Sequence, residues 1–400
     1  MNVKLLIVSI FNNILNVEHY PSCWAEGTII PVFKTGDNDN TDNYRGITLI
    51  SCLGKLFTRV LNNRLGIWAE QEGILGETQF GFRKGREVSD CLFILHGLIE
   101  LLLTRGSKLY CAFIDYEKCY DYLDRTAVWV KLMRSGVSSK IISIFRSMYS
   151  RITLKVDGST DCFYPYCGLL QGESTSPLLF SMFVCDLENS FPSELSGIQL
   201  KNIIMKLLMF ADDTVIVSET KEGLQRGLDS LYMYCMKWGI TVNTKKTKAM
   251  VFKKGGRIAK SDSWTYGGQV VETVNVFKYL GFHLSSSGSF SNGIQERVKS
   301  ARRALFALKQ YFSTNTEILL STKMKMFNSV VLPVLSYGSE VWGISKAAPI
   351  ERFHIQFLKS ILHVKSSTPN CYVYGELGVY PLDIDRKVRI IKYVHFMMFT

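Results

Sequence analysis

Two neighbouring aspartates between two apolar segments constrain the fold of this chain more than any other feature. Asp212 and Asp213 separate residues 201–210 from residues 214–218, and both segments have the length and composition of buried strands. This pattern predicts a hairpin with two carboxylates at its turn. Adjacent anions between buried strands repel each other and are poorly hydrated, so a positive charge must compensate them. Carboxylate oxygens suit magnesium; the alternative is an ordinary solvated Asp-Asp turn.

A third acidic residue, Asp115, follows another apolar segment of strand length, residues 109–114. If the two acidic strands are neighbours in one sheet, Asp115 lies against Asp212. Such carboxylates suit nucleotidyl transfer with two metal ions, which lie about 3.5–4 Å apart in sites of this kind. One ion would lower the pKa of the attacking 3′-hydroxyl, and the other would hold the triphosphate and stabilise the leaving pyrophosphate. The hypothesis depends on the two strands being neighbours.

Charge and cysteine content indicate the kind of partner and the compartment. The 400-residue chain has 47 Lys and Arg against 35 Asp and Glu, and its net charge of +12 favours a polyanionic partner over a merely basic surface. Its 10 Cys form neither a CxxC pair nor a Cys/His cluster of zinc spacing, which indicates reduced core cysteines. We find no signal peptide and no membrane-length apolar stretch. We therefore expect an intracellular protein, nuclear or cytoplasmic, without a membrane partner; no sequence feature indicates an oligomeric state.

Hydrophobic periodicity predicts helices that alternate with strands. Helices are expected over residues 1–20, 53–68, 89–103, 125–133, 178–187 and 224–238. Further strands are expected over residues 28–33, 153–156, 249–252 and 276–280, and the chain is mostly helical from residue 294. Asp124 should cap the fourth helix, and Ser176, followed by Pro177, the fifth. This order predicts an α+β sheet domain with helical attachments.

Five sequence blocks, taken in order, resemble the reverse transcriptases of LINE-type (non-LTR) retrotransposons, and the resemblance covers almost the whole chain. The first block is IPVFK at residues 30–34, with NYRGITL at 43–49 and QFGFR at 79–83; the second is FIDYEKCYD at 113–121. The third is GLLQG at 168–172 with SPLLF at 176–180, the fourth is FADD at 210–213, and the fifth combines WGI at 238–240, KTK at 246–248 and YLG at 279–281. The order of all five makes the resemblance specific.

This resemblance implies a metal-dependent catalytic centre. The expected catalytic and metal-binding residues are Asp115, Asp212 and Asp213, the last of which is often only near the metal. The implied cofactor is a pair of Mg²⁺ ions, for which Mn²⁺ can substitute. Lys246 would protonate the leaving pyrophosphate; the alternative is one surface lysine among many.

The resemblance also implies a site for an incoming deoxynucleoside triphosphate (dNTP). Lys34 and Arg45 are expected to contact the triphosphate, since both form charge-assisted bonds with phosphate; Arg45 could instead pin a surface loop. Tyr120, where the family more often has Phe, should lie under the sugar and exclude ribonucleotides by blocking a 2′-hydroxyl. Gln171 and Gly172 should pack on the forming base pair, and Gly172 permits a close backbone approach.

Contacts with an RNA template and a DNA primer are implied as well. The expected contact residues are Gln79, Gly81, Phe82, Tyr279, Leu280, Gly281, Arg302 and Arg303. The last two belong to residues 297–312, which contain five basic residues and no acidic one. Such a segment suits a thumb helix along a duplex backbone; a solvated basic face is the alternative.

We therefore interpret the chain as an RNA-directed DNA polymerase with an α+β, right-hand polymerase fold: an antiparallel-sheet palm, helical fingers and a helical thumb. The expected parts are an N-terminal extension and fingers at residues 1–105, a palm at 106–284, a thumb at 285–345 and a partial helical connector at 346–400. The reverse transcriptase domain would cover residues 27–284 overall. The enzyme would extend a DNA primer on an RNA template with dNTPs.

Three other interpretations stay open. The first is a catalytically inactive, nucleic-acid-binding remnant of such an element, because the endonuclease and Cys/His knuckle of full elements are not recognisable, which suggests a fragment or a decayed copy. The second is an intron-encoded maturase, which should have a different helical domain after the palm. The third is a nucleotide cyclase, which would not need the basic thumb segment.

Overall fold

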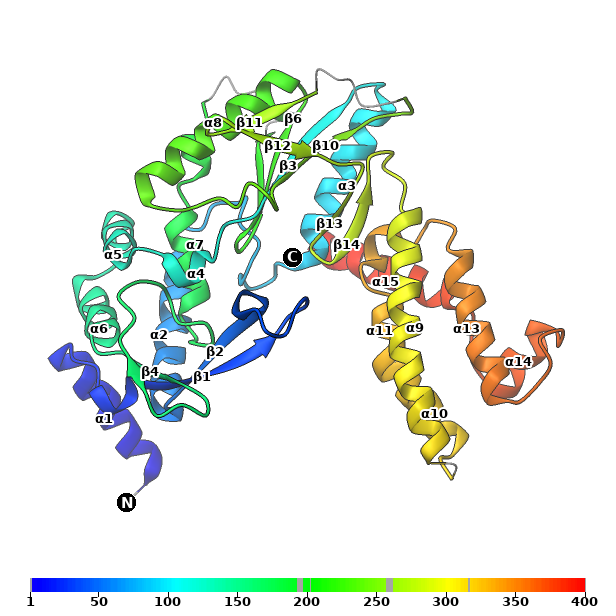
Figure 1. Ribbon diagram of the computed structural model, residues 1–400, viewed down its shortest axis with the longest axis horizontal. Coiled ribbons are helices and arrows are strands. Elements are labelled where there is room, and N and C mark those ends of the chain that lie inside the picture. Colours follow the sequence, from blue (N-terminus) through cyan, green and yellow to red (C-terminus); the bar gives the residue numbers. More distant parts are fainter. Residues whose placement is uncertain (1, 193–196, 202, 257–261, 316, 400) are drawn as a thin grey trace.

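The computed structural model describes residues 2–399 except residues 193–196, 202, 257–261 and 316. Its helices are α1 (Val3–Val17), α2 (Cys52–Gln71), α3 (Val88–Thr104), α4 (Cys119–Tyr122), α5 (Arg125–Arg134), α6 (Ser139–Tyr149), α7 (Ser176–Val184), α8 (Lys221–Trp238), α9 (Ser291–Thr314), α10 (Leu320–Met326), α11 (Leu332–Leu335), α12 (Ser339–Trp342), α13 (Ala348–Ile361), α14 (Asn370–Leu377) and α15 (Leu382–Phe399). Its strands are β1 (Glu26–Phe33), β2 (Tyr44–Ile50), β3 (Leu109–Ile114), β4 (Thr153–Val156), β5 (Cys162–Phe163), β6 (Ile198–Leu200), β7 (Ile203–Met205), β8 (Leu207–Phe210), β9 (Asp213–Ser218), β10 (Lys248–Phe252), β11 (Trp264–Tyr266), β12 (Gln269–Thr273), β13 (Val276–Tyr279) and β14 (Phe282–Ser285). Figure 1 shows the β1–β2 hairpin on one side of the molecule and an arm of helices, α9 to α14, on the other.

A six-stranded sheet in the order β11-β12-β10-β3-β9-β8 forms the centre. Neighbouring strands are antiparallel, apart from the parallel pair β10 and β12. Along β3, Ala112 and Ile114 face one hydrophobic core, while Cys111 and Phe113 face a second core on the opposite side. Helix α8 contributes to the first core and α3 to the second. Because both faces are covered, the central strands are continuously apolar.

A smaller, four-stranded sheet in the order β2-β1-β4-β5 carries the hairpin seen in Figure 1. Strands β1 and β2 are antiparallel, with Phe33 opposite Tyr44. Strand β1 also runs parallel to β4, with Glu26 opposite Thr153. Residues 153–163, which lie in the range expected for the palm, thus share a sheet with residues expected for the fingers.

The β13–β14 hairpin joins the central sheet to the helical arm. Its turn has left-handed backbone at Leu280 (φ 43°) and Gly281 (φ 79°). The Tyr337 hydroxyl donates to the Leu280 carbonyl oxygen at 2.5 Å, and Arg297 donates to the Gly281 carbonyl oxygen at 2.7 Å. These two bonds fasten the turn to α9 and to the chain just before α12.

The end of the chain returns to the central domain. Helix α12 contacts both α3 and α15. The Tyr393 hydroxyl of α15 donates to the buried carboxylate of Asp90 in α3 at 2.7 Å, and its ring lies 5.7 Å from that of Phe93. The helical arm and the sheet therefore share one hydrophobic core.

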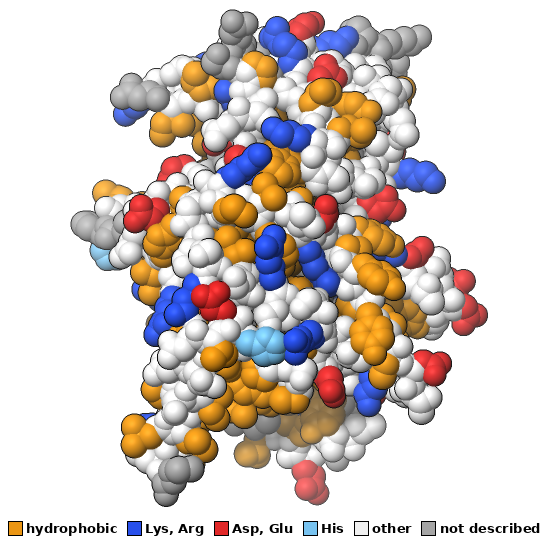
Figure 2. Space-filling model, turned by 90° about the vertical axis from the view of Figure 1, so that its left-hand side faces the viewer, with side chains coloured by type: hydrophobic (Ala, Val, Ile, Leu, Met, Phe, Trp, Pro, Cys, Tyr) orange, Lys and Arg blue, Asp and Glu red, His pale blue; other side chains and the backbone are white. Residues whose placement is uncertain are grey.

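Helix α1 packs along one side only. Phe11 lies edge-on to Trp24 and Phe57, with ring centroids 6.3 and 5.2 Å away, whereas Val3 and Leu5 are exposed. Figure 2 views this side of the molecule, where hydrophobic side chains lie between scattered lysines and arginines. Among the described residues, no helix combines the length and apolarity needed to cross a membrane.

The structure corrects some of the expected elements. The strand expected over residues 201–210 is two strands, because Ile203–Met205 pairs with β6 while Leu207–Phe210 pairs with β9. The N-cap of α7 is Thr175 and not Ser176. Strands β2, β11, β12 and β14 have no counterpart among the expected strands; each is short or partly polar and is held by a neighbouring strand.

Candidate active site

The pairing of β3 with β9 brings the acidic residues to one edge of the central sheet. Their antiparallel register leads Asp115, just after β3, to the edge where β9 begins with Asp213. The β8–β9 hairpin closes with Phe210 opposite Asp213, so Ala211 and Asp212 form its turn. The hypothesis that the two acidic strands are neighbours is confirmed.

A buried glutamine holds the acidic turn. Ala211 has a left-handed backbone (φ 57°), which residues other than glycine rarely adopt without support. The Oε1 of Gln79 accepts from the amides of Ala211 and Gly81, both at 2.9 Å, and its Nε2 donates to the Ala211 carbonyl oxygen at 3.4 Å. A Cβ on Gly81 would lie 2.2 Å from the Ala211 nitrogen. Gln79 and Gly81 therefore position the turn that carries Asp212, while their contact with primer or template stays a prediction.

The negative charge on the three carboxylates is unfavourable where they lie. Burial raises the pKa of Asp115 and of Asp212, with Lys246 acting against it at the first and Arg45 at the second. Although part of Asp213 is exposed, desolvation by the surrounding protein and repulsion from the two other aspartates raise its pKa to about 6. Within the described chain, no Lys or Arg forms an ion pair with these carboxylates. Lys246 and Arg45 therefore offset the negative charge only from a distance.

A cleft of about 680 Å³ opens between the smaller sheet and the acidic edge. The expected site residues that line it are Lys34, Arg45, Phe82, Asp115, Tyr120, Gln171, Gly172, Asp212 and Lys246. An adjoining pocket of about 130 Å³ is lined by Asp115, Asp213, Lys246 and Tyr279. Segments more than 200 residues apart in the sequence thus meet at one site, as the family resemblance implied.

A backbone connection sets Lys246 beside Asp115. The Asp115 carbonyl oxygen accepts from the Asn243 amide at 2.8 Å, and the Asp115 amide donates to the Thr247 hydroxyl at 3.1 Å. The loop before β10 therefore runs along the end of β3. Its Lys246 side chain lines the cleft and lowers the pKa of Asp115, in opposition to burial.

Comparison with known proteins agrees with this arrangement. The model of the family "Reverse transcriptase (RNA-dependent DNA polymerase)" matches residues 33–284. This chain belongs to the reverse transcriptase family. Its motifs and its relatives make it a LINE-type, non-LTR member, and the α+β right-hand fold expected from the sequence is confirmed.

Two curated relatives come from Drosophila melanogaster. The "RNA-directed DNA polymerase from mobile element jockey" is 24% identical over 371 residues, which cover 90% of this chain and 39% of the relative. The "Probable RNA-directed DNA polymerase from transposon BS" is 26% identical over 372 residues, which cover 88% and 39%. The reverse transcriptase chain therefore spans about two-fifths of the length of these relatives. An apo telomerase from Candida tropicalis is a looser structural match, with a TM-score of 0.49 and 16% identity over 86% of this chain and 61% of that one.

Ring stacking and hydrogen bonds hold the part of the reverse transcriptase cleft that contains Tyr120 and Gln171. The ring of Tyr120 stacks on Phe180 at 4.9 Å. Gln171 donates from Nε2 to the Asp121 carboxylate at 2.8 Å, and its carbonyl oxygen accepts from the Thr48 amide at 2.7 Å. The loop that carries Gln171 is therefore tied both to helix α4, which carries Tyr120, and to strand β2, which carries Arg45.

Position 172 requires glycine for two reasons, its backbone angle and its close contact with strand β2. Its φ is 107°, and a Cβ there would lie 2.8 Å from the Thr48 carbonyl oxygen. The loop therefore approaches β2 as closely as its backbone allows. The neighbour at this close approach is protein backbone, and the expected packing of Gly172 on a base pair stays a prediction.

The expected primer and template residues fall into three groups. Phe82 is largely exposed and lines the cleft. Tyr279 is buried with its ring 5.4 Å from Phe113, so it supports the turn at Leu280 and Gly281 from beneath. Arg302 and Arg303 are exposed on α9, outside the cleft.

Sequence reasoning missed Glu173, a nearly buried carboxylate that lines the cleft. Its Oε2 accepts from the amides of Thr175 and Ser176 at 2.7 and 3.2 Å, and from the Thr175 hydroxyl. Glu173 thus caps the start of α7 in place of the expected Ser176 side chain. The signal was present in the sequence, because a carboxylate shortly before a Ser-Pro helix start can bond to the first free amides.

Proposed function

We propose that this chain is an RNA-directed DNA polymerase that extends a DNA primer on an RNA template, adding dNTPs and releasing pyrophosphate. The observation that carries the proposal is the meeting of Asp115 and Asp212 at one cleft with Lys34 and Arg45. Carboxylates on one wall and fixed cations on another suit a triphosphate bound through metal ions. Family membership supports the same reaction class.

Two Mg²⁺ ions are the proposed cofactor, with Mn²⁺ as a substitute. Asp115, Asp212 and Asp213 fit such ions because they are hard oxygen donors whose pKa values are raised mainly by burial, which a bound cation would oppose. In the described part of the chain, no three carboxylate, imidazole or thiol groups are arranged to hold a metal by themselves. This agrees with the habit of Mg²⁺ of taking one or two carboxylates and completing its shell with substrate phosphates and water. When bound, the ions would lower the pKa of the attacking 3′-hydroxyl and stabilise the leaving pyrophosphate.

The side chains around the cleft have separate proposed roles. Lys34 and Arg45 hold oxygens of the triphosphate by charge-assisted bonds. Tyr120, fixed by its stack on Phe180, lies under the sugar and leaves no room for a 2′-hydroxyl. Lys246 stands beside Asp115 and delivers a proton to the leaving pyrophosphate. Gln171 and Gly172 lie against the forming base pair.

The primer and template are proposed to run from this cleft toward the helical arm. The turn at Leu280 and Gly281, with Tyr279 beneath it, would support the primer end, and Phe82 would contact the template. Arg302 and Arg303 would neutralise phosphates. The fingers, palm, thumb and connector keep the boundaries proposed from the sequence.

Primer extension tests this function. A DNA primer on an RNA template, with dNTPs and Mg²⁺, should be extended by the wild type and not by Asp115→Ala or Asp212→Asn, because each change removes a proposed metal ligand. Circular dichroism and duplex binding would verify that the variants are folded. If folded wild type binds the duplex but does not extend it, the chain is the inactive remnant of such an element. Equal extension by all three proteins would instead refute the assigned ligands.

A further inference from the structure

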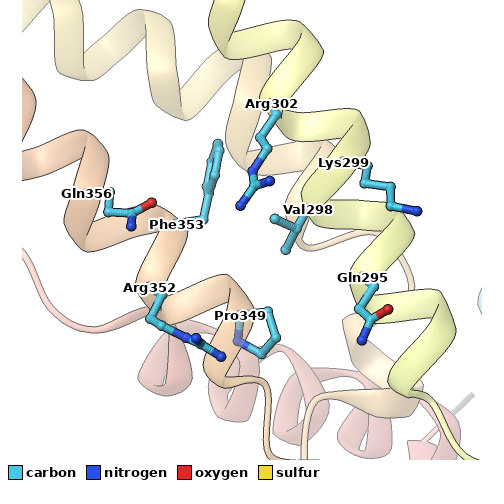
Figure 3. A pocket seen from close by; sticks show the side chains of 8 residues that line it. All are labelled: Gln295, Val298, Lys299, Arg302, Pro349, Arg352, Phe353 and Gln356. Carbon is cyan, nitrogen blue, oxygen red and sulfur yellow. The ribbon is translucent and has the colours of Figure 1, made fainter.

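A groove separates helices α9 and α13 in the helical arm. It consists of two adjoining pockets of about 340 and 270 Å³, which share Arg302, Phe353 and Gln356 in their linings. Figure 3 shows Arg302 and Phe353 pointing into the groove from opposite helices, with Gln356 and Arg352, one turn apart on α13, on either side of Phe353. The groove lies outside the catalytic cleft, since the residues that line the two sites do not overlap.

The lining of this groove is basic. Its charged residues are Lys299, Arg302, Lys309 and Arg352, and no carboxylate lines it. Lys299 is paired with Glu296 at 2.7 Å. The other three cations have no carboxylate partner among the described residues. Uncompensated cations on both walls favour a polyanion between them.

Aromatic rings and amides interrupt this basic lining. Phe306 on α9 is 64% exposed, an unusual position for a phenylalanine, while the ring of Phe353 on α13 is mostly covered by its neighbours. Gln295 offers amide donors and acceptors in the larger pocket, and Gln356 offers them where the two pockets adjoin. Cations that can follow a backbone, together with rings on which bases can stack, are the combination found in sites for single-stranded nucleic acid.

The size of the groove argues against a duplex. The two parts of the groove have volumes of about 340 and 270 Å³, the size of pockets that enclose small ligands, so a double helix, whose major groove alone is about 12 Å wide, would lie across their openings and not inside them. A single strand can enter with its phosphates on the arginines and its bases turned toward a ring.

We propose that the α9–α13 groove binds a single-stranded segment of nucleic acid, separately from the primer–template duplex at the catalytic cleft. Arg302 would then serve this strand, while Arg303, one residue on and about 100° around the helix, faces elsewhere. Like the proposed function, the inference takes nucleic acid as the partner, but it does not depend on catalysis. The strand would be a flanking, unpaired part of the template.

Direct binding of an unstructured oligonucleotide tests the groove. The probe is fluorescein-labelled oligouridine, and its affinity is followed by fluorescence anisotropy over a range of salt concentrations. Phe306→Ala should weaken binding by about 5- to 150-fold if one base stacks on the ring, and Phe306→Trp should restore it. Tyr311→Ala is the matched control, because Tyr311 is an exposed aromatic residue of the same helix that does not line the groove.

A charge reversal distinguishes binding in the groove from non-specific attraction to the basic surface. Arg352→Glu should weaken binding and lower the slope of log affinity against log salt by about 0.7 for each phosphate that the protein no longer neutralises. Lys365→Glu changes the net charge equally at an exposed position outside the groove and should have little effect. Oligothymidine of the same length distinguishes an RNA preference from binding of any single strand.

Two results would overturn the inference. One is equal weakening by Arg352→Glu and Lys365→Glu with no effect of Phe306→Ala, since binding would then be non-specific. The other is groove-dependent binding of poly-glutamate but not of oligouridine, which would make the occupant an acidic protein. Primer extension on a template with a minimal overhang tests the proposed catalysis without the proposed groove, because no long single strand is then present. Its failure in wild type with groove-dependent binding intact refutes catalysis alone, whereas normal extension without groove-dependent binding refutes the groove alone.

Discussion

At the scale of single residues, the three aspartates occupy different positions in the backbone, and these positions set how each carboxylate faces the site. Asp115 is tied through its own amide and carbonyl groups to the loop of Lys246. Asp212 sits in a two-residue turn, and Asp213 begins a strand with part of its side chain exposed. The first two face the large cleft, whereas Asp213 lines the smaller pocket beside it. We therefore expect Asp115 and Asp212 to matter more for catalysis than Asp213.

We predict that Tyr120 determines the preference for deoxyribonucleotides over ribonucleotides. Replacing it by Ala removes the ring that stacks on Phe180 and opens room for a 2′-hydroxyl. The preference for dNTPs over ribonucleotides, measured as the ratio of kcat/KM values, should fall by about 10- to 200-fold, the range for steric discrimination of one small group. Tyr120→Phe keeps the ring and should keep the preference. A preference unchanged in Tyr120→Ala would show that another residue excludes the hydroxyl.

At the scale of elements, the site depends on contacts between segments that are not neighbours in the sequence. The hairpin of β8 and β9 is held by Gln79, which precedes α3. Strand β2 is tied to the Gln171 loop through Thr48. Because each catalytic segment is braced by a different element, small changes in these braces should affect activity.

Gln79→Ala tests the brace of the acidic turn. It leaves the buried amides of Ala211 and Gly81 without their acceptor, at a cost of about 1–3 kcal/mol each before relaxation. We expect a lower midpoint of urea unfolding together with slower primer extension in the protein that remains folded. Gln79→Glu keeps an acceptor for the two amides but buries a further carboxylate beside the acidic turn, so it should not restore stability. Full stability and activity in Gln79→Ala would mean that the turn holds itself.

A buried histidine in α13 should make stability depend on pH. His354 is enclosed beside Phe327, at a ring distance of 5.7 Å, and its Nδ1 has no hydrogen-bond partner. Burial lowers its pKa to about 4, against about 6.5 in an unfolded chain. The unfolded state therefore binds the proton first, so the stability present above pH 6.5 is lost as the pH falls toward 4, by about 3 kcal/mol at most.

His354→Leu should remove this dependence. Urea unfolding at pH 7 and at pH 4.5 would measure the loss of stability in wild type and variant, and carboxylates that titrate in both proteins cancel in the difference. The variant should lose less stability than wild type between the two pH values. An equal loss in both would mean that His354 is protonated in the folded protein.

At the scale of the whole molecule, the helical arm is packed into the sheet domain as one body. The core behind the central sheet continues through α9 and α13 to the last helices. Tyr393 and Asp90, which lie 303 positions apart in the sequence, meet in a hydrogen bond of 2.7 Å. The arm should therefore unfold together with the sheet rather than before it.

Tyr393→Phe tests this connection. Asp90 would lose one of its two partners while remaining buried, which costs about 1–3 kcal/mol. We expect one cooperative unfolding transition at a lower urea concentration in the variant. Tyr372→Phe removes an exposed hydroxyl of the same kind and should change nothing. A separate early transition of the helical arm would contradict a shared core.

Local features of this protein follow from its amino-acid sequence alone. The strand at residues 109–114, the carboxylates at the turn of a hairpin and the helix ending at Trp238 all follow from periodicity and turn chemistry within a few residues. The order of the five blocks was also enough to indicate the family, because motif spacing is a property of the chain alone. The predicted N-cap of α7 and the single strand predicted over residues 201–210 were wrong, because Glu173 accepts from the amides at the start of α7 and Ile203–Met205 pairs with β6.

Which of these pieces meet is a property of the folded chain. Folding brings Lys246 to Asp115 and Gln79 under Ala211, joins β4 to β1 across more than 100 residues, and opens a basic groove between α9 and α13. None of these contacts has a local signature, because each depends on hydrogen bonds and packing between surfaces that exist only when the sheet has formed. The chemistry of the residues is therefore readable from the sequence, whereas their assembly into a cleft and a groove comes from long-range packing.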